Sequence, residues 1–172
     1  MTRRLSEGTT FLLPVGHGQF GVGLLTRVPA RGGVVFGYFF GPRRSGHPTE
    51  PWLMSRVASQ AVFRCRFRDR ALYSGEWPTL LVLPAFDRNL WPLPAFHSYD
   101  GSVTAIPGST AVVDWRVEYD DGNLVTPKSE TPASGTDMLL DDDTVYDPNS
   151  LARAVAPRLL SSVPSADEGG WR

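Results

Sequence analysis

Few side chains in this 172-residue sequence could carry out covalent or metal chemistry. Of the residue types most often used for this chemistry, it has one cysteine, Cys65, and three histidines, His17, His47 and His97. The histidines lack the short spacings typical of metal ligands, and neither G-x-S-x-G nor H-x-x-x-H occurs. We therefore predict a protein that is not an enzyme and holds no metal or cofactor. A site that folding assembles from the histidines stays open as an alternative.

One glycine motif, Gly16-x-Gly18-x-x-Gly21, matches a dinucleotide-binding pattern. That pattern needs a helix after the loop, but the residues that follow predict a strand. A kinase-type glycine loop is also disfavoured, because the only lysine is Lys128. The motif is better interpreted as a tight hairpin turn.

Charge is strongly polarised along the chain. Residues 1–70 carry eleven arginines against three acids, whereas residues 114–147 carry ten acids against two basic residues. The acidic segment could fill a basic cleft of a protein partner, and the run 141–143 lacks the spacing of a calcium loop. The candidate partner-binding residues are Glu118, Asp120, Asp121, Asp141, Asp142 and Asp143. Alternatively, the two halves face one another or are simply solvated.

The segment Ala61–Arg68 has the clearest alternation in the chain. One face holds Phe63, Cys65 and Phe67, so we expect Cys65 to be a buried, inert thiol. The other face holds Arg64, Arg66 and Arg68. This row is either the wet face of a strand or a surface that binds nucleic acid or an acidic partner.

The remaining pattern predicts an α+β, mainly β fold. Strands are expected at Thr9–Val15, Phe20–Arg27 and Val34–Phe40, in a strongly curved antiparallel sheet or partial barrel bent at Gly21 and Gly23. A short middle helix is expected at about Glu50–Ser59, burying Trp52, Leu53 and Val57, and Leu72, Tyr73 and Trp77 are expected at a core edge.

Further along the chain, we expect a buried strand at Thr79–Leu83 and then a proline-rich aromatic loop over residues 84–108. A strand at Thr110–Tyr119 should turn at residues 120–123 and pair back through Leu124–Thr126, ahead of a mobile segment at Pro127–Thr136. The last helix should start at Pro148, bury Leu151, Val155 and Leu159, and break or kink after Ala156 because of Pro157. We expect one β-rich domain over residues 1–160 and a disordered tail over 161–172.

Composition places the chain among ordinary globular proteins. It is 41% hydrophobic and 20% charged, with a single cysteine and no run long enough for a membrane span. The N-terminus has two arginines but no apolar stretch behind them, unlike a signal peptide. A cytoplasmic location without membrane association is the expectation.

Several short motifs, in a fixed order, carry a family resemblance. They are Gly8-x-x-Phe11-x-x-Pro14, Phe20-Gly21-x-Gly23, Phe39-Phe40, Phe63-x-Cys65-x-Phe67 and then Leu72, Gly75 and Trp77-Pro78. Over about Glu7 to Phe96 the chain resembles the Immunity protein 26 (Imm26-like) family of bacterial polymorphic toxin systems. The resemblance implies a non-enzymatic cytoplasmic protein that binds and neutralises a cognate toxin, and it supplies no catalytic residues. The alternative is a small β-barrel module that binds nucleic acid or peptide through the arginine row.

Overall fold

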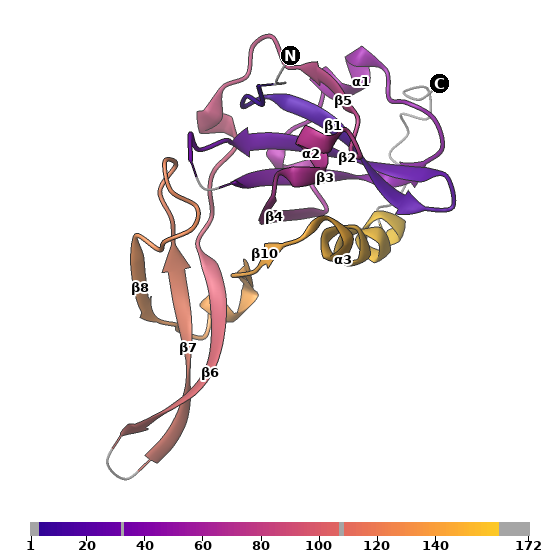
Figure 1. Cartoon of the computed structure of the whole chain (residues 1–172). Helices are drawn as coiled ribbons and strands as arrows, with labels where there is room; N and C mark the ends of the chain where they lie inside the picture. The colour runs from indigo at the N-terminus through magenta and orange to yellow at the C-terminus, as the bar shows by residue number, and fades with distance from the viewer. Residues whose placement is uncertain (1–3, 32, 107–108, 162–172) are drawn as a thin grey trace.

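The computed structural model describes residues 4–31, 33–106 and 109–161, whose strands form two sheets (Figure 1). The first has the order β10-β4-β3-β2-β1-β5, with β1 (Thr9–Gly16), β2 (Gln19–Arg27), β3 (Val34–Arg44), β4 (Phe63–Arg68), β5 (Thr79–Val82) and β10 (Val145–Tyr146). The second has the order β8-β7-β6-β9, with β6 (Phe96–Ile106), β7 (Ser109–Glu118), β8 (Ser129–Pro132) and β9 (Asp141–Asp142). The helices are α1 (Glu50–Met54), α2 (Arg70–Ser74) and α3 (Pro148–Ser161).

The first three strands form the expected antiparallel sheet. The β1–β2 turn uses positive φ angles at Gly16, His17 and Gly18, as the hairpin interpretation of the glycine motif requires. The β2–β3 register shifts between Phe20 and Val22, which places the expected irregularity at Gly21. The fold is mainly β and open on one side, which confirms the predicted class without closing a barrel.

Glycines in β2 also let other elements come close. A Cβ atom on Gly23 would lie 2.0 Å from Cζ of Phe11, and one on Gly21 would lie 2.7 Å from a methyl carbon of Leu159 in α3. The curved sheet therefore closes over its own aromatic core because β2 has no side chains at these two points.

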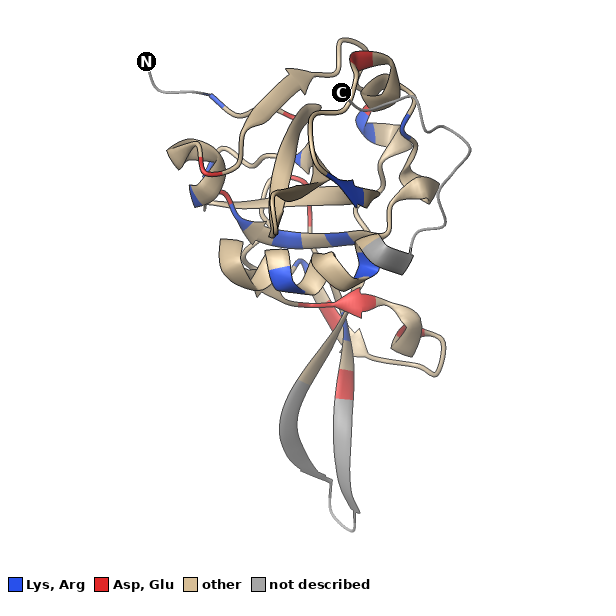
Figure 2. Cartoon of the chain, turned by 90° about the vertical axis from the view of Figure 1, so that its right-hand side faces the viewer, with Lys and Arg blue, Asp and Glu red and all other residues tan. Residues whose placement is uncertain are grey.

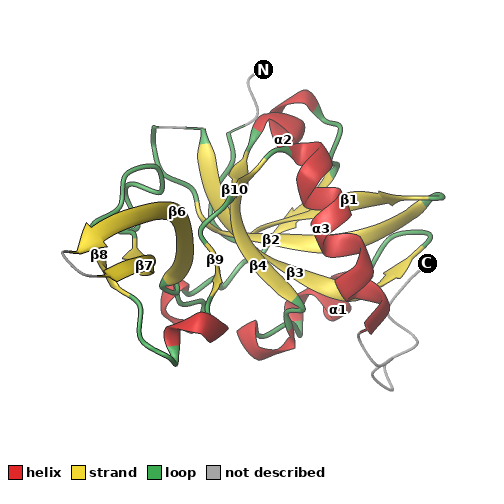
Figure 3. Cartoon of the chain, turned by 90° about the horizontal axis from the view of Figure 1, so that it is seen from below, coloured by secondary structure: helices red, strands yellow, loops and turns green. Residues whose placement is uncertain are grey.

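Two apolar clusters cover opposite faces of the first sheet. One joins Phe11, Phe39, Phe67 and Trp77 to α3, and the Phe11 and Trp77 rings stack with centroids 5.7 Å apart. The other includes Phe36, Tyr38, Phe40, Trp91 and Phe96 and lies toward the second sheet. Figure 3 shows α3 crossing the first sheet. Since both faces are covered, alternate residues of the central strands are buried on either side.

The helix α3 confirms the predicted apolar stripe. Leu151, Val155 and Leu159 are all fully buried. Of the two expected effects of Pro157, a break or a kink, the break is wrong, because the helix continues to Ser161. Pro157 is exposed, and burial of the stripe on both sides of it holds the helix together. The tail predicted to be disordered lies, from residue 162 on, outside the described residues.

The middle helix is shorter than predicted. It begins at Glu50 after Thr49 and buries Trp52 and Leu53 as expected, but it ends at Met54. The prediction for Val57 is wrong, since 51% of this residue is exposed and offers no burial to extend the helix. Leu72 and Trp77 are buried as expected, whereas Tyr73 on the unpredicted helix α2 is 49% exposed.

Three expectations about the chain after α2 are corrected. The loop predicted over residues 84–108 contains an 11-residue strand, β6, because the prolines lie before Phe96 or at position 107 and leave the strand itself free. β5 is only partly buried, because it lies at the edge of the first sheet. The strand that pairs back on β7 is β8, within the segment expected to be mobile.

The reason for this delayed pairing is a turn at Asn123. The side-chain oxygen of Asn123 accepts hydrogen bonds from the backbone N–H groups of Val125 and Thr126. These two N–H groups are therefore not available to β7. The first backbone bond back to β7 comes from Lys128, whose N–H donates to the carbonyl of Glu118 at 2.7 Å.

Candidate functional site

Arg66, from the middle of β4, lies between the two sheets with its side chain only 3% exposed. Its guanidinium donates to Oδ1 of Asp143 at 2.5 Å and to the backbone carbonyl of Leu124 at 2.7 Å. The same group lies 3.9 Å from the ring centre of Tyr119, whose hydroxyl donates to the other oxygen of Asp143 at 3.1 Å. The partners come from far along the chain, so this arginine links the first sheet to the acidic C-terminal segment.

Arg64 makes the neighbouring link. Its Nε donates to Asp141 at 2.5 Å, in a pair whose side chains are 39% and 28% exposed. The pairing of β10 with β4 runs parallel and joins Val145 to Arg66, which holds the acidic turn alongside the arginine strand. In Figure 2 a red acidic segment lies between the first sheet and the base of the β6–β7 hairpin.

A second group of charges lies around Asp121, in the turn after β7. Asp121 accepts from the buried Arg27 and, at 3.1 Å, from Arg88, which also pairs with Glu7 at 2.6 Å. Burial raises the pKa of Asp121, but the hydrogen bonds and charges of Arg27 and Arg88 outweigh that effect and hold it below its ordinary value.

Arg116 on β7 is the centre of a third group of charges. It donates to Glu118 and Asp137, both at 2.9 Å. Two hydrogen bonds from Ser134, one backbone and one side-chain, together with the bond from Arg116, lower the pKa of Asp137 to about 2. This carboxylate fixes the turn at η3 (Asp137–Leu139), next to the acidic segment.

The predicted partner-binding carboxylates therefore divide into two sets. Asp121, Asp141 and Asp143 hold arginines of the first sheet, and Glu118 holds Arg116. Asp120 and Asp142 are exposed and make no ion pair among the described residues. The alternative that the oppositely charged halves face one another thus accounts for much of the charge pattern.

The arginine row is divided in the same way. Arg66 is buried, Arg64 is half-buried in its pair with Asp141, and of the three only Arg68 is exposed. Alternation along β4 correctly separates the two faces, and Phe63, Cys65 and Phe67 lie in the core beneath α3. The acidic segment buries Arg66 and pairs with Arg64, so the charges of these two arginines are already matched within the chain and are not free to bind nucleic acid or peptide.

The residues with possible covalent or metal chemistry do not come together. His17 lies in the β1–β2 turn, whereas Nε2 of His97 lies 3.5 Å from Asp114 on the paired strands β6 and β7. Within residues 4–31, 33–106 and 109–161, no three His, Cys, Asp or Glu side chains are grouped to hold a metal. Burial raises the pKa of the Cys65 thiol well above its usual range, which keeps it protonated.

Sequence reasoning missed one surface feature, an apolar groove of about 170 Å³ beside α1. Met54 and Leu90 lie on it, 51% and 68% exposed, and Trp91 is buried at its edge. The two residues are 36 positions apart in the sequence, so no local pattern indicates the groove.

Fold and charges together describe a small, mainly β protein whose two sheets are joined by internal ion pairs. The chain belongs to the Immunity protein 26 family, whose model matches residues 6–105. No curated protein and no solved structure matches the chain. The match covers β1 to β5 and most of β6, whereas all six predicted partner-binding carboxylates lie beyond it. Membership implies a role in immunity to a toxin.

Among the described helices, none has the length and apolar character needed to cross a membrane.

Proposed function

We propose that this chain is a non-enzymatic, cytoplasmic immunity protein that binds a cognate toxin of a bacterial polymorphic toxin system and neutralises it by direct contact. The observation that carries the proposal is the family match over residues 6–105. The fold supports it. The ion pairs of Arg27, Arg64 and Arg66 with aspartates of the C-terminal segment hold the two sheets together, and they do not converge on a reaction centre.

The acidic C-terminal segment is the proposed electrostatic part of the contact surface. Asp120 and Asp142 can meet a basic partner without breaking an internal ion pair. Glu118 can exchange partners, because its pair with Arg116 is partly open to water, with side chains 46% and 37% exposed. Asp121, Asp141 and Asp143 contribute negative charge near the surface while holding arginines of the first sheet. Such a surface complements a toxin whose active site attracts phosphate.

The first experiment tests toxin binding and protection. The tagged protein is co-expressed with the product of the adjacent upstream gene, and growth is compared with that gene expressed alone. Rescued growth and a stoichiometric complex are the expected results. Absence of both toxicity and a complex would remove the proposal for this pair of proteins.

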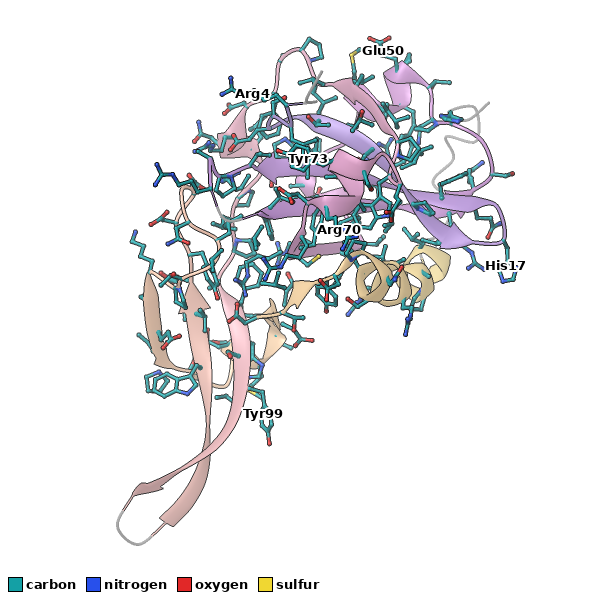
Figure 4. The ribbon with its side chains drawn as sticks, viewed as in Figure 1. Arg4, His17, Glu50, Arg70, Tyr73 and Tyr99 are labelled. Carbon is teal, nitrogen blue, oxygen red and sulfur yellow. The ribbon has the colours of Figure 1, made fainter. Side chains whose placement is uncertain are left out.

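The second experiment maps the acidic surface. The double variant Asp120→Lys/Asp142→Lys should associate with the toxin roughly tenfold more slowly at low salt, with a smaller difference at high salt. The control, Glu50→Lys/Glu76→Lys, has the same change in net charge and alters exposed carboxylates elsewhere. Figure 4 shows Glu50 at the opposite end of the molecule from Tyr99 in the hairpin. Equal association rates for the two variants would rule out the acidic surface while leaving toxin binding intact.

A further inference from the structure

The hairpin of β6 and β7 extends well beyond the strands that support its base (Figure 1). At the base, β9 pairs with Phe96 and His97, and β8 pairs with Trp115–Glu118. Just after β8, the N–H group of Ala133 donates to the backbone carbonyl of Asp114 on β7 at 2.8 Å. Farther out, the described backbones of β6 and β7 pair only with each other, in a register that joins Val103 to Val112 and Ile106 to Ser109.

This outer part, residues 101–106 and 109–113, forms a two-stranded ribbon. It leaves the base at a register shift between Tyr99 and Val103. Its two outer edges carry backbone N–H and C=O groups without a strand partner among the described residues. Such edges are templates for pairing with another strand, and proteins usually block them with charges, prolines or covering elements.

The ribbon has none of the blocking residues. From Gly101 to Val113 the sequence contains no charged residue, and its single proline, Pro107, lies between the two strands. Val, Thr and Ile make up much of it, and these residues favour β structure. A two-stranded hairpin without a third strand is marginally stable in water, so an added strand would stabilise it.

We propose that the ribbon is a docking arm for an extended segment of the cognate toxin, which adds as a strand to one of its edges. The inference rests on the proposed function, which supplies a polypeptide partner. An uncharged edge recognises the main chain of its partner through ladder hydrogen bonds rather than through side-chain charge. Tyr99, 69% exposed beside the base, is placed to cover the end of such a strand (Figure 4).

The limits of the family match bear on specificity. The match ends at residue 105, so β7 lies outside it and the ribbon is only half included. A cognate pair must discriminate against the toxins of related systems. Because part of the arm lies outside the family model, its presence and length, rather than its side chains, would decide which toxins find an edge to pair with.

The test measures amide hydrogen exchange of the intact protein, alone and bound to the product of the adjacent upstream gene. Strand addition should slow exchange at least tenfold in the ribbon, at alternate residues of one strand. As a second measurement, residues 100–113 are replaced by Asn-Gly, a turn that closes the base directly after Tyr99. This variant should keep the melting temperature of the native protein, because the first sheet is unchanged, and it should bind the toxin at least tenfold more weakly. The control Thr104→Val/Ala111→Val, a cross-strand pair, should bind normally, because main-chain recognition tolerates side-chain changes.

The outcomes separate the two proposals. A complex that rescues growth but leaves ribbon exchange unchanged overturns the docking arm and keeps the immunity function. No complex and no rescue overturns the immunity function, and the toxin-docking arm with it. A dimer of this chain that disappears in the shortened variant, with ribbon protection already present without toxin, overturns the toxin as occupant in favour of a second copy.

Discussion

Arg66 on β4 and Asp143, just before β10, form an ion pair at 2.5 Å with side chains that are 3% and 12% exposed. The pair joins residues 77 positions apart, and Tyr119 covers it on one side. Because both charges are removed from water, the loss of one partner leaves the other buried and uncompensated. The pair is therefore a main support of the junction between the two sheets.

We predict that Arg66→Met destabilises the protein by about 3–5 kcal/mol, because Asp143 is then left buried without its ionic partner. Urea unfolding followed by circular dichroism gives the free energy of unfolding. The control Arg64→Met affects the more exposed pair with Asp141 and should cost about 1 kcal/mol or less. Equal losses in the two variants would show that burial does not distinguish the pairs.

A second prediction concerns the close approach of β2 to the aromatic core. Gly23→Ala should destabilise the protein by about 1–3 kcal/mol, because the new methyl group would overlap the ring of Phe11, which lies between neighbouring aromatic rings and cannot move freely. Gly135→Ala is the matched control. Nothing lies within 4 Å of a Cβ at Gly135, and its free energy of unfolding should change by about 0.5 kcal/mol or less. A Gly23→Ala protein as stable as this control would contradict the close packing of β2 on Phe11.

The parts of the fold that follow from local periodicity could be predicted from sequence. Alternation in β4 separates its two faces, and the spacing of Leu151, Val155 and Leu159 defines the buried side of α3. Local pattern does not show what covers the outer face of a strand. Arg66 looks like a solvated residue in the sequence, and only the return of the acidic segment to β4 makes it a buried one.

The strand β6 could not be predicted from the local sequence either. Prolines on both sides of it indicate a loop, but a strand requires only that no proline interrupts its own ladder. The apolar groove at Met54 and Leu90 arises purely from tertiary contact, as does the division of the acidic residues into paired and exposed carboxylates. These features depend on long-range pairing, which residue type and spacing do not specify.

A third prediction follows from Asp137, whose pKa is lowered to about 2 by hydrogen bonds from Ser134 and Arg116. An unfolded aspartate titrates near about 3.9, so the unfolded chain takes up this proton first as the pH falls. The stability that Asp137 supplies is complete above about pH 4 and is lost as the pH approaches 2. Urea midpoints of the native protein and Asp137→Asn should therefore differ most above about pH 4 and converge toward about pH 2. A constant difference across this range would contradict the assignment.

The last prediction concerns Cys65, which is 1% exposed and whose thiol has a pKa raised well above its usual range by burial. Only the thiolate reacts readily with disulfide reagents, and here both access and ionisation are suppressed. In native protein at mildly alkaline pH, Cys65 should react with a chromogenic disulfide only as fast as the chain unfolds, and in concentrated guanidinium it should react at once.

A second variant shows whether unfolding controls this reaction. Val155 on α3 belongs to the same buried cluster as Cys65, so Val155→Ala removes methyl groups from the cluster without changing the thiol. The variant should be labelled faster than the native protein, because the thiol becomes accessible only when the core opens and the weakened core opens more often. Rapid labelling of the native protein would place Cys65 at the surface and contradict its position in the core beneath α3.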